Sequence, residues 1–199
     1  MNMRNLINLV EGETLNELQG TKAHPKSFPT KEAFYRYMEQ MGFELIGAGL
    51  SGAVFDHPKF QGRYIMKLFA DAEYEHFVHW VMDQSVQNEH LPRFYGKLIK
   101  VSQNGRLIRM ERLAPLPKAR RRGLMRLINA AVEVIQGQTD YDTASAWFTE
   151  DDDESLFDTL MAVLKEGGPE TDDLHEQNVM MRGNTIVVTD PWGGGTFRW

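Results

Sequence analysis

The sequence contains no cysteine, and its apolar runs are short. The missing thiols exclude disulfide bonds and thiolate metal sites, and they fit a reducing compartment such as the cytoplasm. Apolar stretches of only a few residues exclude a membrane-spanning helix and a secretory signal. We therefore expect a cytoplasmic protein that has no membrane partner.

An excess of basic residues is also missing. Lysine and arginine number 22 against 28 acidic residues, which gives a net charge of -6. Such a chain lacks the broad positive field that attracts nucleic-acid phosphates, so nucleic acid is not an expected partner. Hydrophobic residues make up 42% and charged residues 25% of the 199 residues. This composition predicts a globular chain of one domain, which can divide into two lobes.

Short apolar segments in the first half predict an antiparallel sheet. Each is bounded by Gly or Pro, and the Asn104-Gly105 pair between the last two favours the positive backbone angles of a hairpin turn. The five expected strands span residues 43–48, 53–57, 64–68, 93–101 and 106–112.

Four other segments repeat their apolar residues at helical spacing. Thr30 is a suitable cap for the first, and Gly42 and Gly137 end the first and the third. A polar connection is expected between the third and the fourth, and a hairpin of residues 179–181 and 186–188 follows the fourth. The expected helices lie at residues 30–42, 71–86, 124–137 and 156–164.

Two short charged runs carry no site by themselves. The basic run 118–122 fits a solvated helix start, although cations are unfavourable at a helix N-terminus. The acidic run 150–154 lacks the glycine turn and the ligand spacing of a calcium loop, and it fits the beginning of the fourth helix.

A glycine-rich segment lies between the first two expected strands. Gly47, Gly49 and Gly52 together with Val54 give the spacing G-x-G-x-x-G-x-V, and Ser51 lies within it. Missing side chains let backbone N–H groups approach phosphate oxygens. A dinucleotide site requires a helix directly after the glycines, whereas a strand is expected here, so the segment indicates the phosphate lid of a kinase. A glycine-rich hairpin turn without a ligand is the alternative.

Lys67 ends the segment Tyr64-Ile65-Met66-Lys67 of the third expected strand, which is otherwise apolar. A cation there requires a partner, because burying an unpaired ammonium is costly. An ATP phosphate satisfies this requirement, with a carboxylate of the following helix to orient the lysine. Glu73 and Glu75 are the candidates, and helical phase does not choose between them. A strand-end lysine whose ammonium lies in solvent is the alternative.

Three polar residues near the end of the sequence carry the strongest chemical pattern. Asp173 and Asn178 have the spacing D-x-x-x-x-N, and Asp190 follows after the expected hairpin. A base at Asp173 can accept the proton of an attacking hydroxyl, while Asn178 and Asp190 supply hard oxygen ligands to Mg²⁺ bound to ATP phosphates. Turn capping by Asp173 and loop hydrogen bonding by Asn178 are the alternative.

These motifs together resemble those of a known family. The order GAGLSGAV, YIMK, RMERL, DLHEQN and TDPWG resembles the protein-kinase-like superfamily, and most closely the early serine/threonine protein kinase of T-seven-like bacteriophages. The resemblance implies an α+β, two-lobed protein-kinase-like fold with a five-stranded antiparallel N-lobe and a reduced, mainly helical C-lobe. The implied parts are an N-terminal helical extension, the N-lobe and the abbreviated C-lobe, at residues 1–42, 43–114 and 115–199.

The same resemblance implies where a nucleotide binds. ATP with Mg²⁺ would lie between the lobes, with Lys67 on the α- and β-phosphates. Met110 would lie at the rear of the adenine pocket, and the backbone from Glu111 to Leu113 would form the hinge.

The implied activity is transfer of the ATP γ-phosphoryl group to serine or threonine of host proteins, by a phage-encoded kinase in the host cytoplasm. Two alternatives stay open. Only nine residues follow Asp190, too few for an activation segment, which favours a pseudokinase-like protein that binds and inhibits a host or defence factor. The D-L-H sequence at Asp173 also occurs in aminoglycoside and other small-molecule phosphotransferases, which makes a small-molecule acceptor the second alternative.

Overall fold

The computed structural model of the chain describes residues 28–49, 52–146, 151–168 and 174–192. The chain divides into two compact units. The described part of the first comprises the residues up to 75 together with 93–112, and the second comprises 76–92 and the residues from 113 onward.

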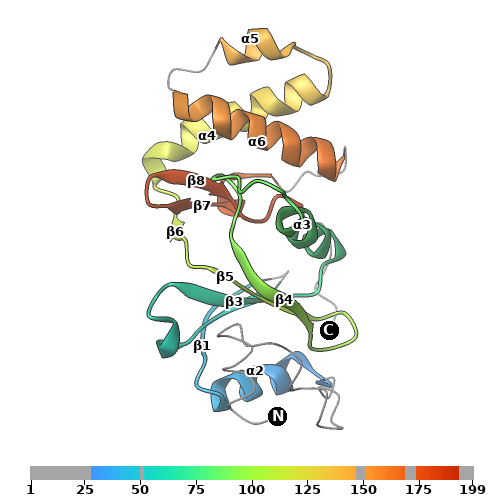
Figure 1. Cartoon of the computed structure of the whole chain (residues 1–199), viewed down its shortest axis with the longest axis vertical. Coiled ribbons are helices and arrows are strands. Elements are labelled where there is room, and N and C mark those ends of the chain that lie inside the picture. Colours follow the sequence, from blue (N-terminus) through green and yellow to red (C-terminus); the bar gives the residue numbers. More distant parts are fainter. Residues whose placement is uncertain (1–27, 50–51, 147–150, 169–173, 193–199) are drawn as a thin grey trace. The chain divides into compact units, whose positions relative to one another are not determined.

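The first unit contains a five-stranded sheet whose neighbouring strands are all antiparallel, in the order β1-β2-β3-β5-β4 (Figure 1). Apolar residues at strand spacing and glycines at the strand ends therefore predicted this sheet correctly. The strands are β1 (Glu44–Ala48), β2 (Gly52–Asp56), β3 (Tyr64–Phe69), β4 (Phe94–Lys100) and β5 (Arg106–Glu111).

Helix α2 (Lys31–Gln40) supplies apolar side chains to the core of the first unit. The hydroxyl of Thr30 accepts the backbone N–H of Ala33 and so caps the helix, as expected. Phe34 and Met38 share one helix face and are fully buried with the β2 residue Phe55. Burial of this apolar face is what stabilises a helix of ten residues.

Helix α3 (Ala72–Met82) follows β3 and runs from the first unit into the second. The carboxylate of Asp71 caps it by accepting the backbone N–H groups of Glu73 at 2.8 Å and Tyr74 at 3.3 Å. The helix ends four residues before the expected limit at Val86. Val86 is 78% exposed, so no burial of its side chain favours another helical turn.

The second unit is mainly helical. Its helices are α4 (Lys118–Ile135), α5 (Tyr141–Ser145) and α6 (Asp151–Gly167), and α4 packs along α6 (Figure 1). A small antiparallel sheet, in the order β6-β7-β8, accompanies them. Its strands are β6 (Ala114–Pro115), β7 (Val179–Arg182) and β8 (Thr185–Val188), and η3 (Glu176–Asn178) is a single 3₁₀ turn before β7.

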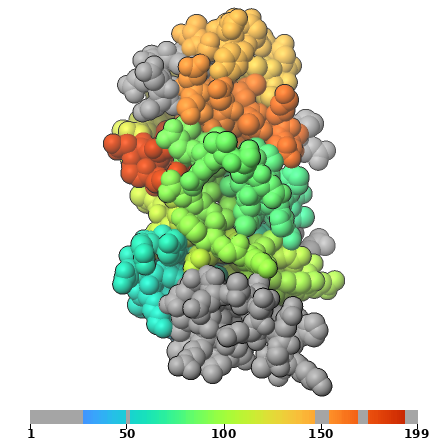
Figure 2. All heavy atoms as spheres, in the orientation of Figure 1, coloured from blue at the N-terminus to red at the C-terminus, as the bar shows by residue number. Residues whose placement is uncertain are grey.

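The connection after α4 is not simply polar, which corrects one expectation. Asp140 accepts the backbone N–H of Thr143 at 2.7 Å and starts α5, and Ala144 of this helix is fully buried. The hydroxyl of Tyr141 donates to Asp158 of α6 at 2.7 Å, and this hydrogen bond raises the pKa of Tyr141 to about 12. The atoms of α5 and α6 accordingly lie against each other (Figure 2).

The hairpin between β4 and β5 exists, but its turn differs from the expected one. Neither Asn104 nor Gly105 has a positive φ. The turn is instead closed by the Ser102 hydroxyl, which accepts the backbone N–H of Gly105 at 2.8 Å, while Val101 donates its N–H to the Gly105 carbonyl at 3.0 Å. A side-chain hydrogen bond thus replaces the left-handed backbone that the Asn-Gly pair suggested.

The predicted α+β class is confirmed: a five-stranded antiparallel sheet is followed along the chain by a mainly helical unit. Among the described residues, no helix combines the length and the apolar character needed to cross a membrane.

Candidate functional site

The glycine-rich segment forms the connection between β1 and β2. Ala48 pairs with Ala53, and Gly49 donates its N–H to the carbonyl of Gly52 at 2.9 Å. Ser51 lies outside the described residues. A strand follows the glycines directly, so the strand-loop-strand context required for a phosphate lid is present.

The three glycines have different structural environments. A Cβ on Gly52 would overlap the carbonyl oxygen of Leu68 on the neighbouring strand, so the close approach of β2 to β3 requires a glycine there. A Cβ on Gly49 would meet nothing within 4 Å, and one on Gly47 would make an ordinary contact with Val54. Sheet packing therefore explains Gly52, whereas it leaves Gly49 unexplained.

We expect Gly52→Ala to lower the free energy of unfolding by about 1–3 kcal/mol, because the strands must separate to accept the methyl group. Gly49→Ala is the matched control, and its free energy of unfolding should stay unchanged or rise slightly, since its φ is not positive. Urea unfolding of both variants measures the difference. Equal losses in the two variants would show that the Leu68 overlap does not determine stability.

Lys67 lies in the middle of the sheet on β3, paired with Val54 of β2 and Ile108 of β5. Its side chain is half-buried. The ammonium nitrogen lies 3.5 Å from the centre of the Tyr74 ring, which belongs to the first turn of α3. The helix after β3 therefore reaches this lysine, as the motif order requires, and an aromatic ring makes the contact.

The two carboxylates proposed to orient Lys67 have other described contacts. Glu75 accepts the Nε–H of Arg106 on β5 at 2.9 Å. Glu73 is exposed, and a hydrogen bond with the Asp71 carboxyl raises its pKa. Neither contact singles out Glu73 or Glu75 as the group that orients the lysine.

The proposed adenine and hinge residues end the first unit and begin the second. Met110 is buried in β5, paired with Ile65 and Phe94. Glu111 is buried as well, and its carboxylate accepts the backbone N–H of Arg93 at 2.8 Å. Leu113 is buried and is the first residue of the second unit after β5, so the division between the units falls inside the predicted hinge.

Asn178 and Asp190 are joined through the backbone. The carbonyl of Asn178 accepts the N–H of Thr189 at 2.9 Å and that of Asp190 at 3.3 Å, and the Thr189 hydroxyl also donates to it, at 3.0 Å. The backbones of the two proposed metal ligands are therefore hydrogen-bonded to each other. Both side chains are half-exposed. Asp173, the proposed base, lies outside the described residues.

The hairpin of β7 and β8 brings these residues together. Val179 pairs with Val188, and the turn uses Gly183, whose φ of 59° is favourable for glycine. Val179, Val187 and Val188 are buried. The apolar side of the hairpin therefore fixes the register that closes Asn178 onto Asp190.

The basic run 118–122 is largely solvent-exposed at the beginning of α4, as expected, and two of its arginines also make hydrogen bonds. Arg121 donates to the carboxylate of Glu176 in η3 at 3.0 Å, and Arg120 donates to the carbonyl of Asn184 in the hairpin turn at 2.6 Å. These contacts offset the unfavourable position of the cations, and they hold the turn that carries Asn178.

Several positioning groups were missed at the sequence level, because nothing in the local pattern marks them. Arg182 of β7 donates to the carbonyls of Glu89 at 2.7 Å and Leu91 at 2.9 Å, and the ring of His90 contacts the Ile186 carbonyl at 2.8 Å. These hydrogen bonds hold residues 89–91, which precede β4, against the β7–β8 hairpin.

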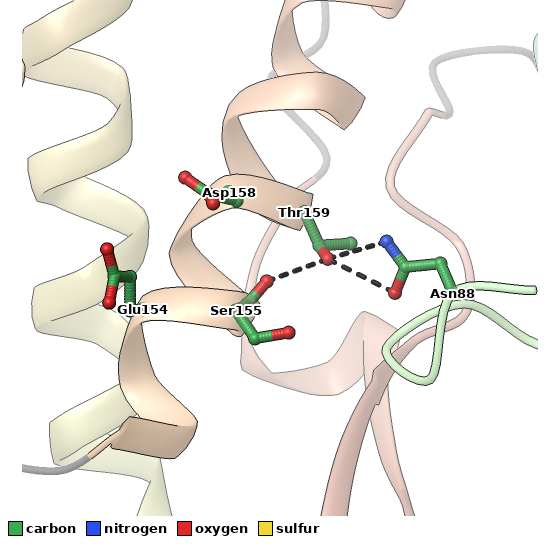
Figure 3. A pocket seen from close by; sticks show the side chains of 5 residues that line it. All are labelled: Asn88, Glu154, Ser155, Asp158 and Thr159. Atoms are coloured by element: carbon green, nitrogen blue, oxygen red, sulfur yellow. Dashed lines mark hydrogen bonds between the residues drawn. The ribbon is translucent and has the colours of Figure 1, made fainter. Parts of the chain in front are cut away.

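Asn88 of the same segment forms a hydrogen bond with α6. Figure 3 shows its side chain facing Thr159, whose hydroxyl accepts the Asn88 amide at 2.9 Å and lies 2.9 Å from the Ser155 carbonyl, to which it donates. These residues line a surface hollow of about 380 Å³ with Glu154 and Asp158. None of the predicted site residues lines this hollow, so it is a separate feature of the second unit.

The donor set at the hairpin fits a magnesium ion held mainly by phosphate. Within the described part of the chain, no group of three or more His, Asp or Glu residues could hold a metal by itself. Asn178 and Asp190 supply one amide and one carboxylate, the hard oxygen ligands that Mg²⁺ takes when substrate phosphates and water complete its shell.

No protein-family model matches the sequence, and none of the curated proteins is similar to it. Among solved structures, a thermostable mutant of aminoglycoside phosphotransferase APH(4)-Ia matches at a TM-score of 0.36 and 14% identity, over 78% of this chain and 69% of that one. A second structure of that enzyme, a ternary complex with AMP-PNP and hygromycin B, matches at 0.36 and 15% identity, over 79% and 70%. An ethanolamine kinase of Plasmodium vivax matches at 0.39 and 14%, over 92% and 69%. These likenesses assign no activity to this chain.

Proposed function

We propose that the chain is an ATP- and Mg²⁺-dependent phosphotransferase. The observation that carries the proposal is the backbone contact between Asn178 and Asp190, because it brings together two residues whose side chains offer an amide and a carboxylate oxygen, the kind of ligand that Mg²⁺ takes. Lys67 on β3, behind a glycine-rich strand connection, supplies the cation for the phosphates.

Each group has a defined part in this proposal. Bound Mg²⁺ would neutralise charge on the ATP phosphates. Asn178 and Asp190 would hold it, and Lys67 would bind the α- and β-phosphates. Asp173 would accept the proton of the attacking hydroxyl, whose oxygen bonds to the γ-phosphorus as the bond from that phosphorus to the ADP oxygen breaks and ADP leaves. Catalysis then depends on positioning and electrostatic stabilisation, as it does for phosphoryl transfer in general.

The acceptor that we propose is a serine or threonine hydroxyl of a host protein, with the chain encoded by a phage and acting in the host cytoplasm. The support is the sequence resemblance to early phage kinases. A small-molecule hydroxyl is the second candidate, and the observation that favours it is His175, which gives the D-L-H sequence and caps η3 by accepting the N–H of Gln177 at 3.1 Å.

Radiolabelled ATP tests both the reaction and the acceptor. The purified chain with γ-labelled ATP, Mg²⁺ and bacterial extract should transfer label to serine or threonine of proteins, and a chelator should abolish the transfer. Label only in small molecules would move the acceptor to the second candidate.

A protein that binds a host factor without catalysis should transfer no label, so nucleotide binding is tested separately. ATP with Mg²⁺ should stabilise a nucleotide-binding chain by about 2.7 kcal/mol at a concentration one hundred times the Kd. Thermal unfolding measures this stabilisation. If neither label transfer nor stabilisation is observed, the phosphotransferase proposal is wrong, and inhibition of a host or defence factor by a pseudokinase-like surface becomes the better explanation.

A further inference from the structure

The aromatic ring of Tyr74 contacts the proposed phosphate-binding lysine. The Lys67 ammonium lies 3.5 Å from the ring centre, within the range in which a cation is attracted by the negative face of an aromatic ring. Tyr74 is only 1% exposed, so water competes little for this face. Burial of the ring strengthens such a contact.

Helix geometry explains why a tyrosine and not a glutamate has this position. Successive residues of an α-helix point about 100° apart, so Glu73 and Glu75 flank whichever direction Tyr74 takes. Tyr74 points into the unit, Glu73 is exposed, and Glu75 bonds with Arg106. The side chain between the two candidate carboxylates is therefore the one that meets the lysine.

Local contacts fix the orientation of the ring. Phe69, at the end of β3, meets Tyr74 edge to face with ring centres 4.6 Å apart. The Asp71 carboxylate accepts the backbone N–H of Tyr74 at 3.3 Å. Lys67, Phe69, Asp71 and Tyr74 lie within eight residues of one another and in one unit, so the strand-to-helix turn sets the contact by itself.

We propose that Tyr74 is the positioning residue of Lys67, and that it holds the ammonium for the nucleotide phosphates by a cation–π contact. This inference rests on the proposed function. A neutral ring orients the ammonium without itself cancelling the lysine charge, so this contact is compatible with binding of a polyphosphate.

Fluorinated rings test the contact without changing the shape of the core. Tyr74→Phe should leave the Kd for ATP with Mg²⁺ within about twofold, because the ring face is retained. Mono-, di- and trifluorinated phenylalanines at position 74 should weaken binding step by step, to about fivefold in total, since each fluorine withdraws electrons from the ring face. Tyr74→Leu should reach a similar loss.

Phe34→Leu is the matched control, because Phe34 is a fully buried ring in the same unit and contacts Phe55. It should reduce stability while the Kd stays unchanged. NMR of the full chain provides a readout that is independent of function. The side-chain protons next to the Lys67 ammonium should show an upfield ring-current shift that Tyr74→Leu removes.

The outcomes separate this inference from the proposed function. If Lys67→Ala weakens ATP binding while the fluorinated series has no effect, Tyr74 does not position the lysine and the phosphotransferase proposal stands. If the ring-current shift is present but Lys67→Ala leaves binding unchanged, the contact is structural and the nucleotide role of Lys67 is wrong. A graded loss along the fluorinated series supports the inference, including the case in which Tyr74→Leu fails to fold.

Discussion

Replacing Asp190 with alanine is expected to lower the rate of phosphoryl transfer about a thousandfold, which corresponds to ~4 kcal/mol of transition-state stabilisation. The substitution removes a carboxylate oxygen that we propose binds Mg²⁺. The hydrogen bond of residue 190 to the Asn178 carbonyl is kept, because it comes from the backbone N–H, which alanine also has. Steady-state kinetics with labelled ATP, together with thermal unfolding, measure both quantities.

The control for this substitution is Asp158→Ala in the same unit. Asp158 accepts the Tyr141 hydroxyl and lines the hollow near Asn88, and no part of the proposed chemistry uses it. Its loss should leave the transfer rate unchanged. Asp190→Asn keeps one oxygen ligand without the charge and should have an intermediate rate that rises with metal concentration. A fully active Asp190→Ala variant would contradict the proposed metal role.

The sequence predicted the regular elements because their signals are local. Alternating apolar residues and bounding glycines determine the sheet, and residues 179–188 carry both halves of a hairpin with Gly183 between them. For the same reason, the sequence predicted that Asn178 and Asp190 lie at the two ends of that hairpin. A short hairpin brings its two ends together whatever the rest of the chain does.

The contact between Lys67 and Tyr74 was not predictable from sequence, since it depends on the rotation of α3 against β3. The pattern placed Glu73 and Glu75 on either side of the apolar stripe, and only the packed helix shows that Tyr74 points at the ammonium. The same holds for Arg182 and Asn88, whose bonds join segments more than seventy residues apart. Side chains that act over such separations leave no periodic signal.

Gly52 illustrates how one pattern can have two physical causes. The spacing of the glycines indicated a phosphate lid, and the structure shows that Gly52 is also required by the approach of β2 to the Leu68 carbonyl. Gly49, with open space around its α-carbon, is therefore the better probe of nucleotide contact. A weaker Kd for ATP in Gly49→Ala, at unchanged stability, would report the lid function alone.

Trp192→Ala is expected to lower the free energy of unfolding of the second unit by about 3–5 kcal/mol, the cost of removing a large buried aromatic side chain. Trp192 is 2% exposed and packs against two aromatic rings. Its ring centre lies 5.3 Å from that of Phe77 and 5.6 Å from that of Trp80. Its indole N–H donates to the Val163 carbonyl of α6 at 3.0 Å. The residue therefore packs between α3 and α6.

Trp192→Phe separates the two contributions of this side chain. Phenylalanine keeps a ring against Phe77 but leaves the buried Val163 carbonyl without the indole donor, so a smaller loss of about 1–3 kcal/mol is expected. Urea unfolding followed by far-UV circular dichroism measures both variants. Because Trp192 follows Asp190 by two residues, its burial also fixes the backbone from which the proposed metal ligand extends. Trp192→Phe should accordingly raise the Mg²⁺ concentration required for half-maximal transfer, whereas an unchanged requirement would show that the hairpin alone positions Asp190.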